Sequence, residues 1–136
     1  MIYAVIDTNV LVAALLSKHV DSSTVVIQNH ILDGVVTPLY NAEIVNEYRE
    51  VLHRPKLHLP EELINTVLEA IEEKGIMLGR TKSEETFPDP KDVVFYEVAL
   101  SKEGSYLVTG NKRHFPIDPI VITPAELLEI LKQQSL

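Results

Sequence analysis

The chain has 136 residues, a hydrophobic content of 46% and a formal net charge of −8, which together predict one globular domain over residues 1–136. It has no cysteine, so disulfides, thiolate metal sites and a cysteine nucleophile are excluded. The negative charge counts against a simple nucleic-acid-binding protein, which usually carries a basic face, but a metal-dependent enzyme needs clustered carboxylates.

The first half of the chain alternates apolar runs with helical patterns. The apolar run Ile2–Ile6 predicts a buried strand, and a helix is expected from about Asn9 to Leu16. Ser22 and Ser23 can cap a second helix that runs to Leu32. Residues 35–37 predict a short strand, and Pro38 is expected to open a long helix that ends near His53.

The second half continues the alternation. The expected elements are a helix from Pro60 to a stop at Gly75, a strand over 76–78, a polar loop over 79–90, a helix over 91–102, strands over 106–109 and 120–122, and a final helix opened by Pro124. The strands are uniformly apolar, which is typical of a parallel sheet covered on both faces. The predicted fold class is therefore α/β, a three-layer α/β/α sandwich with a central parallel sheet.

Polar residues follow two of these strands. Asp7 ends the first strand, and Asn111 follows the strand over 106–109. Asp92 lies in the first turn of the helix that precedes that second strand. Ligands of open parallel sheets bind beyond the carboxyl ends of the strands, so we expect these three side chains to meet at one rim.

The long helix that follows Pro38 offers further carboxylates. At about 100° per residue, Glu47 flanks the apolar face of this helix, Glu43 lies further round on the same side, and Glu50 points to solvent. Glu47 is therefore the best candidate to reach over the sheet edge, with Glu43 behind it.

Carboxylates that converge would repel one another, and a divalent cation relieves that repulsion. Mg²⁺ or Mn²⁺ prefers oxygen ligands, polarises phosphate and lowers the pKa of a bound water.

Each residue also has a purely structural interpretation. Asp7 can cap a helix, Asp89 with Pro90 and Asp92 makes a good helix start, Glu47 can be a surface residue, and Asn111 after Gly110 is a common turn residue.

Four blocks of the sequence resemble a known family. They are VIDTNVLVAAL, TPLYNAEIVNEYREVLHRPK, the pair DPKDVVFYEVAL and YLVTGNKRHF, and ITPAELLEIL. In this order they resemble the PIN-domain nucleases, which have a Rossmann-like fold. The similarity is greatest to stand-alone prokaryotic PIN proteins assigned as toxins of type II toxin–antitoxin pairs.

The resemblance implies a ribonuclease that depends on Mg²⁺ or Mn²⁺. It places the metal-binding and catalytic positions on Asp7, Glu47 and Asp92, and the fourth acidic position on Asn111. A carboxamide carries no charge, so Asn111 should weaken a second metal more than the first. Thr109 matches a hydroxyl residue beside the family's metal site, and Thr8 and Asn9 can hydrogen-bond the carboxylate or its waters.

Substrate and partner expectations follow from the same residues. Lys112, Arg113 and His114 could contact RNA phosphate, as could Arg49 and the stretch from His53 to Lys56. The resemblance also implies an antitoxin partner and a homodimer.

The start of the chain has no basic segment typical of a signal peptide, and no apolar run approaches the ~20 residues that span a bilayer. We therefore expect no membrane association and a cytoplasmic protein.

Three alternatives stay open at this point, and one of them, a purely structural subunit, would leave the acidic rim unexplained. A non-catalytic domain that binds RNA or protein would suit Asn111 and the negative net charge. A phosphoryl-transfer α/β domain, either a receiver or a phosphatase with an aspartyl nucleophile, is less suited. A receiver would need an acidic pair after the first strand, and the phosphatase would need an aspartate where Asn9 stands.

Overall fold

The computed structural model describes residues 1–134 and has the predicted α/β fold. Its five-stranded sheet has the order β3-β2-β1-β4-β5, and every neighbouring pair of strands is parallel. The strands are β1 (Ile2–Ile6), β2 (Val36–Tyr40), β3 (Ile76–Met77), β4 (Tyr106–Val108) and β5 (Val121–Ile122). The strand order reverses between β1 and β4, and such a reversal is where open α/β sheets bind ligands.

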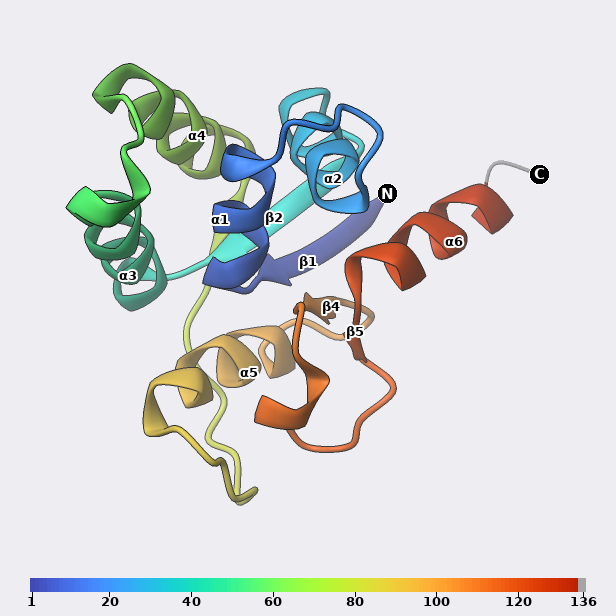
Figure 1. The fold of residues 1–136 in the computed structure, drawn as a ribbon. Coiled ribbons are helices and arrows are strands. Elements are labelled where there is room, and N and C mark those ends of the chain that lie inside the picture. Colours follow the sequence, from blue (N-terminus) through green and yellow to red (C-terminus); the bar gives the residue numbers. More distant parts are fainter. Residues whose placement is uncertain (135–136) are drawn as a thin grey trace.

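Helices cover both faces of the sheet, as Figure 1 shows. The α-helices are α1 (Thr8–Leu16), α2 (Ser23–Leu32), α3 (Ala42–Leu52), α4 (Glu61–Lys74), α5 (Val93–Leu100) and α6 (Pro124–Gln134). Short 3₁₀ turns are η1 (Pro55–Leu57), η2 (Pro90–Asp92) and η3 (Lys112–His114). Helix α5 packs on β1, β2 and β4, while α2 contacts α1, α4 and α6 on the opposite face.

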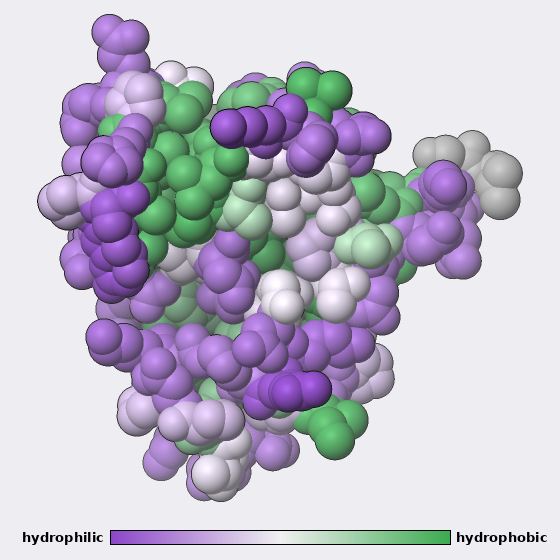
Figure 2. Space-filling view, in the orientation of Figure 1, coloured by the Kyte–Doolittle hydropathy of each residue, from purple (hydrophilic) through white to green (hydrophobic). Residues whose placement is uncertain are grey.

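The core confirms the prediction of apolar strands. Most side chains of β1, β2 and β4 are almost fully buried, together with Phe95 and Val98 of α5 and Tyr48 and Leu52 of α3. Burial of this much apolar surface is the main driving force for folding. Figure 2 shows that hydrophilic residues cover most of one face, whereas apolar surface gathers over α1 and α4. Leu16 of α1 and Leu63 of α4 are 46% and 36% exposed.

The prediction that Pro38 opens the long helix is wrong. Pro38 lies inside β2 opposite Ala4, and α3 begins after Asn41, whose Oδ1 accepts a hydrogen bond of 2.9 Å from the Ile44 amide. Strand β3 pairs with β2 only from Leu39 onward. Pro38 therefore lies just ahead of that ladder, where its missing N–H costs little.

The expected helix over 91–102 is shorter than predicted and has a tighter start. Asp89 caps η2, with its Oδ1 accepting a hydrogen bond of 2.9 Å from the Lys91 amide, and α5 proper begins at Val93. Proline at the first position of η2 removes an N–H that would have no helical partner. This turn fixes the direction in which Asp92 leaves the backbone.

Candidate active site

The candidate site lies where β1 and β4 end side by side. Asp7 follows β1 and Thr109 follows β4, and they are 6% and 0% exposed. The Thr109 hydroxyl donates a hydrogen bond of 2.7 Å to Asp7 Oδ2. Asp7 occupies the N-cap position of α1, but its side chain makes no capping hydrogen bond. Its carboxylate lines the space beyond the sheet, held there by the Thr109 hydroxyl.

Helix α3 brings Glu47 to the same place. The Thr8 hydroxyl donates a hydrogen bond to Glu47 Oε2, and the phenol of Tyr48 donates to the Ile6 carbonyl at the end of β1. Tyr48 is 1% exposed, so it ties the core side of α3 to the strand that carries Asp7. These two contacts hold the Glu47 carboxylate beside the start of α1.

Asp92 reaches the cleft from the end of η2, directly before α5. Its side chain is 15% exposed, and its Oδ2 lies 3.5 Å from His114 Nδ1. Within the described part of the chain, that buried Oδ2 accepts no hydrogen bond. A buried carboxylate oxygen without a donor is costly, so this atom is poised for a cationic ligand.

Burial and neighbouring carboxylates raise the pKa of Asp7 and of Asp92. Burial, then the charges of Asp7 and Asp89, raise the pKa of Asp92 from 3.8 to about 6, although His114 opposes the shift. Burial is also the main reason why the pKa of Asp7 is raised, and Glu47 adds to it, while the Thr109 hydrogen bond lowers it. A divalent cation would remove both the repulsion and the cost of burying charge.

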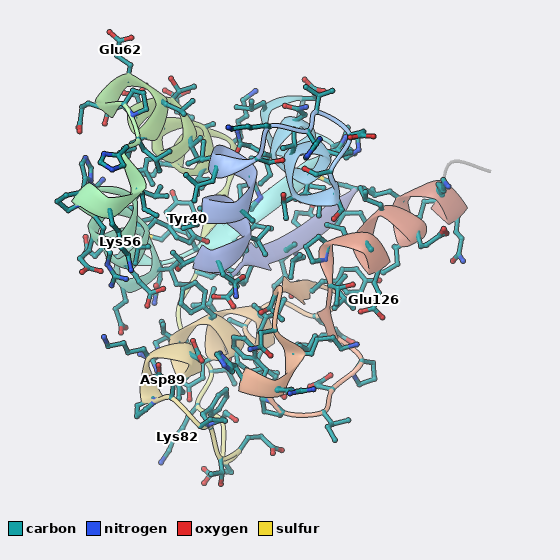
Figure 3. All side chains as sticks on the ribbon, in the orientation of Figure 1. Tyr40, Lys56, Glu62, Lys82, Asp89 and Glu126 are labelled. Atoms are coloured by element: carbon teal, nitrogen blue, oxygen red, sulfur yellow. The ribbon has the colours of Figure 1, made fainter. Side chains whose placement is uncertain are left out.

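These side chains line one cleft of about 560 Å³, called the acidic cleft below. Its acidic members are Asp7, Glu47, Asp89 and Asp92, and Figure 3 shows Asp89 beside the start of α5. Arg54, Lys91 and His114 also line the acidic cleft, along with Thr8 and Asn9. Val12, Ala13 and Val51 form its apolar part.

The donor set fits Mg²⁺ or Mn²⁺, because it consists of hard carboxylate oxygens that need a positive charge. Among residues 1–134, however, no three acidic or histidine side chains converge closely enough to enclose an ion by themselves. Mg²⁺ characteristically keeps several waters and uses only one or two carboxylates directly. Asp7, Glu47 and Asp92 are the residues that would hold it, directly or through water.

The structure separates Glu43 from Glu47. Glu43 accepts two hydrogen bonds, of 3.0 Å and 2.9 Å, from Nη1 of Arg80, and it does not line the acidic cleft. Glu47 does line it. The sequence leaves both carboxylates as candidates. In the structure Glu43 is bound by Arg80, and Glu47 is the one that lines the acidic cleft.

Asn111 and Lys112 do not line the acidic cleft, although the Asn111 amide N–H donates a hydrogen bond of 3.1 Å to the Thr109 hydroxyl beside Asp7. Asn111 Oδ1 accepts a hydrogen bond of 3.2 Å from the Arg113 amide, and its Nδ2 lies 3.1 Å from His114 Nε2. Lys112 pairs with Glu126 of α6 at 3.1 Å. Asn9 supports the turn after β4, since its Oδ1 accepts a hydrogen bond of 3.2 Å from the Gly110 amide.

Sequence reasoning missed several cleft residues. Asp89 was interpreted only as a helix cap, although it both caps η2 and lines the acidic cleft. Lys91 lies between Asp89 and Asp92 in the sequence DPKD, and this spacing of two aspartates is the signal that could have marked the segment. His114, considered only for phosphate contact, lies against Asp92.

Comparison with known proteins assigns the chain to a class. The sequence profile of the PIN domain matches residues 3–113, which include every carboxylate of the acidic cleft. The chain therefore belongs to the PIN-domain family, whose members are generally nucleases and usually use divalent metals.

A more distant similarity is to a larger eukaryotic protein. "Probable nucleolar complex protein 14" of Schizosaccharomyces pombe is 25% identical over 121 residues, which is 88% of this chain. The chain spans only 14% of the length of that protein. No solved structure matches this chain significantly. Of the helices within residues 1–134, none is long and apolar enough to cross a membrane.

Proposed function

We propose that this protein is a ribonuclease that depends on Mg²⁺ or Mn²⁺ and hydrolyses RNA phosphodiester bonds. The observation that carries the proposal is the meeting of Asp7, Glu47 and Asp92, from three separate elements, in one cleft at the reversal of strand order. The raised pKa values of Asp7 and Asp92 are typical of a site built for a charged ligand.

The residues of the acidic cleft have distinct tasks in this proposal. A bound divalent cation supplies Lewis-acid activation of phosphate and of a nucleophilic water. Asp7, Asp92 and, from α3, Glu47 would hold the cation, directly or through water. Thr109 orients the Asp7 carboxylate through its hydrogen bond to Oδ2, and Thr8 orients Glu47 in the same manner.

Substrate contact is proposed for the cations that line the acidic cleft. Arg54 follows α3 and Lys91 lies in η2, so they line the acidic cleft from different elements. Phosphate groups on either side of the scissile bond could bind them, because such contacts position a polynucleotide without reading its sequence. Lys112 is less suited, because it does not line the acidic cleft and pairs with Glu126 at 3.1 Å. Arg54 also pairs with a carboxylate, Glu50 of α3, at 3.2 Å, so RNA phosphate would compete with that ion pair. Arg113 remains a candidate at the rim.

The test is cleavage of a mixed single-stranded RNA pool with Mn²⁺, with Mg²⁺ and with a chelator. Wild-type protein should cut only with metal, and Asp7→Asn prepared in the same way should lose at least about 100-fold of the activity. Equal cutting by both proteins would mean contamination and would remove the support for this site.

A non-catalytic RNA- or protein-binding PIN domain is the second candidate function. It is favoured by Asn111, whose amide is engaged with His114 where the resemblance expects a fourth acid. If wild type binds Mn²⁺ but never cuts RNA, this alternative is preferred. Asn111→Asp is then the informative variant, because restored cutting would trace the loss of activity to the missing charge.

The biological setting is part of the proposal as well. We propose a cytoplasmic toxin held inactive by an antitoxin, and a homodimer, both from the resemblance to prokaryotic PIN toxins. The apolar surface over α1 and α4, where Leu16 and Leu63 are exposed, offers area for a protein partner. Growth arrest on expression, relieved by a co-expressed partner, would support the toxin assignment. Normal growth with an active enzyme would favour RNA processing.

A further inference from the structure

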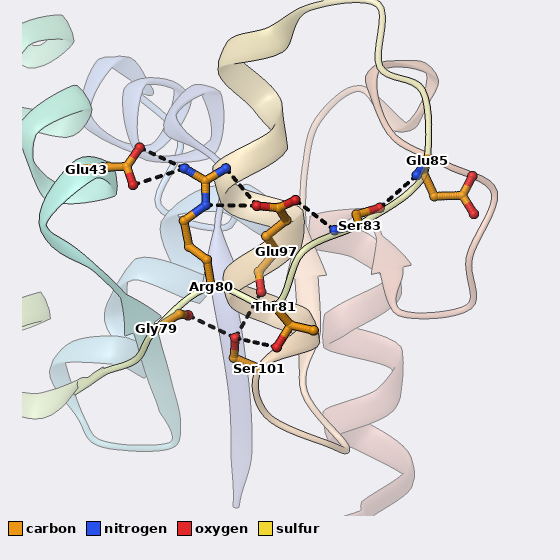
Figure 4. Close-up of polar contacts among 8 residues, drawn as sticks. All are labelled: Glu43, Gly79, Arg80, Thr81, Ser83, Glu85, Glu97 and Ser101. Atoms are coloured by element: carbon orange, nitrogen blue, oxygen red, sulfur yellow. Dashed lines mark hydrogen bonds and ion pairs between the residues drawn. The ribbon is translucent and has the colours of Figure 1, made fainter.

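Arg80 lies between two carboxylates that belong to different helices, as Figure 4 shows. Its Nη1 donates hydrogen bonds of 3.0 Å and 2.9 Å to both oxygens of Glu43 on α3. Its Nε donates one of 2.9 Å to Glu97 Oε1 on α5, and Nη2 lies 2.7 Å from the same oxygen. The planar guanidinium thus uses both its sides, which a lysine cannot do.

The α5 side of this bridge is buried and fully engaged. Glu97 is 7% exposed, and its Oε2 accepts a hydrogen bond of 2.8 Å from the Ser83 amide. The Thr81 amide donates one of 3.1 Å to the Glu97 carbonyl. The segment that carries Arg80 is therefore fixed to α5 by its backbone as well as by its side chain. A carboxylate this deeply buried needs such partners.

The two partners of Arg80 lie close to two proposed cation ligands. Glu43 precedes Glu47 by four residues on α3, which is about one helical turn. Glu97 follows Asp92 by five residues, and α5 continues directly from η2. Any movement of α3 relative to α5 near Arg80 would therefore change the separation of Glu47 and Asp92.

The acidic cleft itself generates a force that opposes closure. Glu47 on α3 and Asp92 at the start of α5 carry like charges, and Asp7 lies in the same cleft. Without metal, mutual repulsion favours a wider separation of the two helices. Arg80 is attracted to a carboxylate on each helix and acts in the opposite direction.

We propose that Arg80 is a positioning residue that fixes α3 against α5, and thereby holds Glu47 and Asp92 at the spacing that a divalent cation requires. The part of this role that concerns the cation rests on the proposed function, whereas the fixing of α3 against α5 does not. The fixed separation of the helices is a property of the metal-free protein and can be measured without it.

The first experiment measures that separation directly. Because the chain has no cysteine, Asn46→Cys on α3 and Lys91→Cys in η2, both exposed, accept spin labels without competing sites. Electron paramagnetic resonance should give a narrow distance distribution in the otherwise native protein without metal. Arg80→Met and Glu43→Ala should each broaden it. An unchanged distribution in both variants overturns the proposal.

The matched control is another Arg–Glu pair on α3. Arg49 lies 3.6 Å from Glu72 of α4 and joins α3 to a helix that carries no proposed ligand. Glu72→Ala should therefore leave the distance distribution unchanged. If Glu72→Ala broadens it as much as Glu43→Ala, the effect is a general loosening of α3 and the proposal fails.

The second experiment measures Mn²⁺ affinity by calorimetry on the same proteins without labels. Glu43→Ala and Arg80→Met should each weaken binding by about tenfold, at the lower end of what loss of a supporting group costs a metal site. The double variant should bind no more weakly than Arg80→Met. Losses that multiply would instead mean that Glu43 is itself a ligand, and the positioning role would be wrong.

The two experiments separate this inference from the proposed function. If wild type and Asp7→Asn have the same Mn²⁺ affinity, the cation site is wrong, and the distance measurement still decides whether Arg80 fixes the helices. If Asp7→Asn abolishes binding and Arg80→Met does not weaken it, the cation site stands and the positioning role of Arg80 is overturned. Arg80→Lys should recover little of the lost affinity, because it cannot bridge both carboxylates.

Discussion

Thr109 and Asp7 are 102 residues apart in the sequence, yet the Thr109 hydroxyl donates a hydrogen bond of 2.7 Å to Asp7 Oδ2. The contact joins the ends of β4 and β1 at the point where the strand order reverses. It is buried, and it positions a carboxylate that lines the acidic cleft. The hydrogen bond therefore links the stability of the sheet to the chemistry of the acidic cleft.

Thr109→Val should lower the stability of the fold and weaken metal binding in the acidic cleft. The substitution keeps the shape of the side chain but leaves a buried carboxylate without its donor, which costs about 1–2 kcal/mol of unfolding free energy. The pKa of Asp7 should rise further, because the Thr109 hydrogen bond lowers it. Urea denaturation measures the first effect, and Mn²⁺ titration should show weaker binding.

Thr66→Val is the control for this prediction. Thr66 is exposed on α4, and its hydroxyl donates a hydrogen bond of 2.9 Å to the Glu62 carbonyl in the same helix. The unfolding free energy of Thr66→Val should stay within about 0.5 kcal/mol of that of wild type. An equal loss in both variants would show that the Asp7 contact has no special role.

Asp92 should make the metal-free protein less stable as the pH rises. Burial and neighbouring carboxylates raise its pKa from 3.8 to about 6, so folding favours the protonated form. This contribution is complete below the unfolded-state pKa of about 4 and is lost as the pH passes through about 6. Since water screens part of the interaction, we expect a loss of about 1 kcal/mol.

Comparison with Asp92→Asn isolates this effect. The amide does not titrate, so the difference in stability between the two proteins should change between about pH 4 and about pH 7, with wild type favoured at the acidic end. Chemical denaturation at several pH values measures it. Added Mn²⁺ should stabilise wild type increasingly above about pH 6. A pH-independent difference would contradict the placement of Asp92 among like charges.

Arg54 and Lys91 should control the salt dependence of RNA binding. Each phosphate contact on a single strand contributes about 0.7 to the slope of log affinity against log salt concentration. Arg54→Gln and Lys91→Gln should each reduce the slope by about that amount, as measured by fluorescence anisotropy with Asp7→Asn as the background. Lys18→Gln, at an exposed lysine just beyond the C-cap of α1, should leave the slope unchanged.

Gly75 tests the packing of the sheet edge. A Cβ atom at Gly75 would lie 2.4 Å from the Ile71 carbonyl oxygen and 2.5 Å from that of Pro38, so both backbones would have to move. Gly75→Ala should therefore cost about 1–3 kcal/mol in thermal or urea unfolding. Gly79→Ala, where nothing lies within 4 Å of a new Cβ, should change stability far less. Equal effects would mean that the contact at Gly75 is not the cause.

Local patterns predicted the sheet and much of the site. Uniformly apolar strands indicate a covered parallel sheet, and the carboxyl ends of such strands define one rim, which is why Asp7 and Asp92 could be placed together. Helical periodicity put Glu47 beside the apolar face of α3. The structure confirms the α/β fold and brings these three carboxylates into one cleft.

Other features depend on contacts that no local pattern encodes. Glu43 and Glu47 lie on the same side of α3. They differ because Arg80, from a polar loop with no sequence motif, binds the Glu43 carboxylate. Glu97 lies in a helix whose other residues are mainly apolar, and its partners come from that same loop. From sequence alone, Pro38 indicates a helix start. It is tolerated within β2 because β3 pairs only from Leu39 onward, and the length of that pairing cannot be predicted from the local sequence.

The central claim is that Asp7, Glu47 and Asp92 hold a divalent cation at the reversal of strand order. The most direct test is a Mn²⁺ titration of wild type and Asp7→Asn, followed by electron paramagnetic resonance at near-neutral pH. Wild type should show a saturable site that Mg²⁺ displaces, and Asp7→Asn should lose it while remaining folded. Equal binding by the two proteins, or no saturable binding by wild type, would contradict the claim.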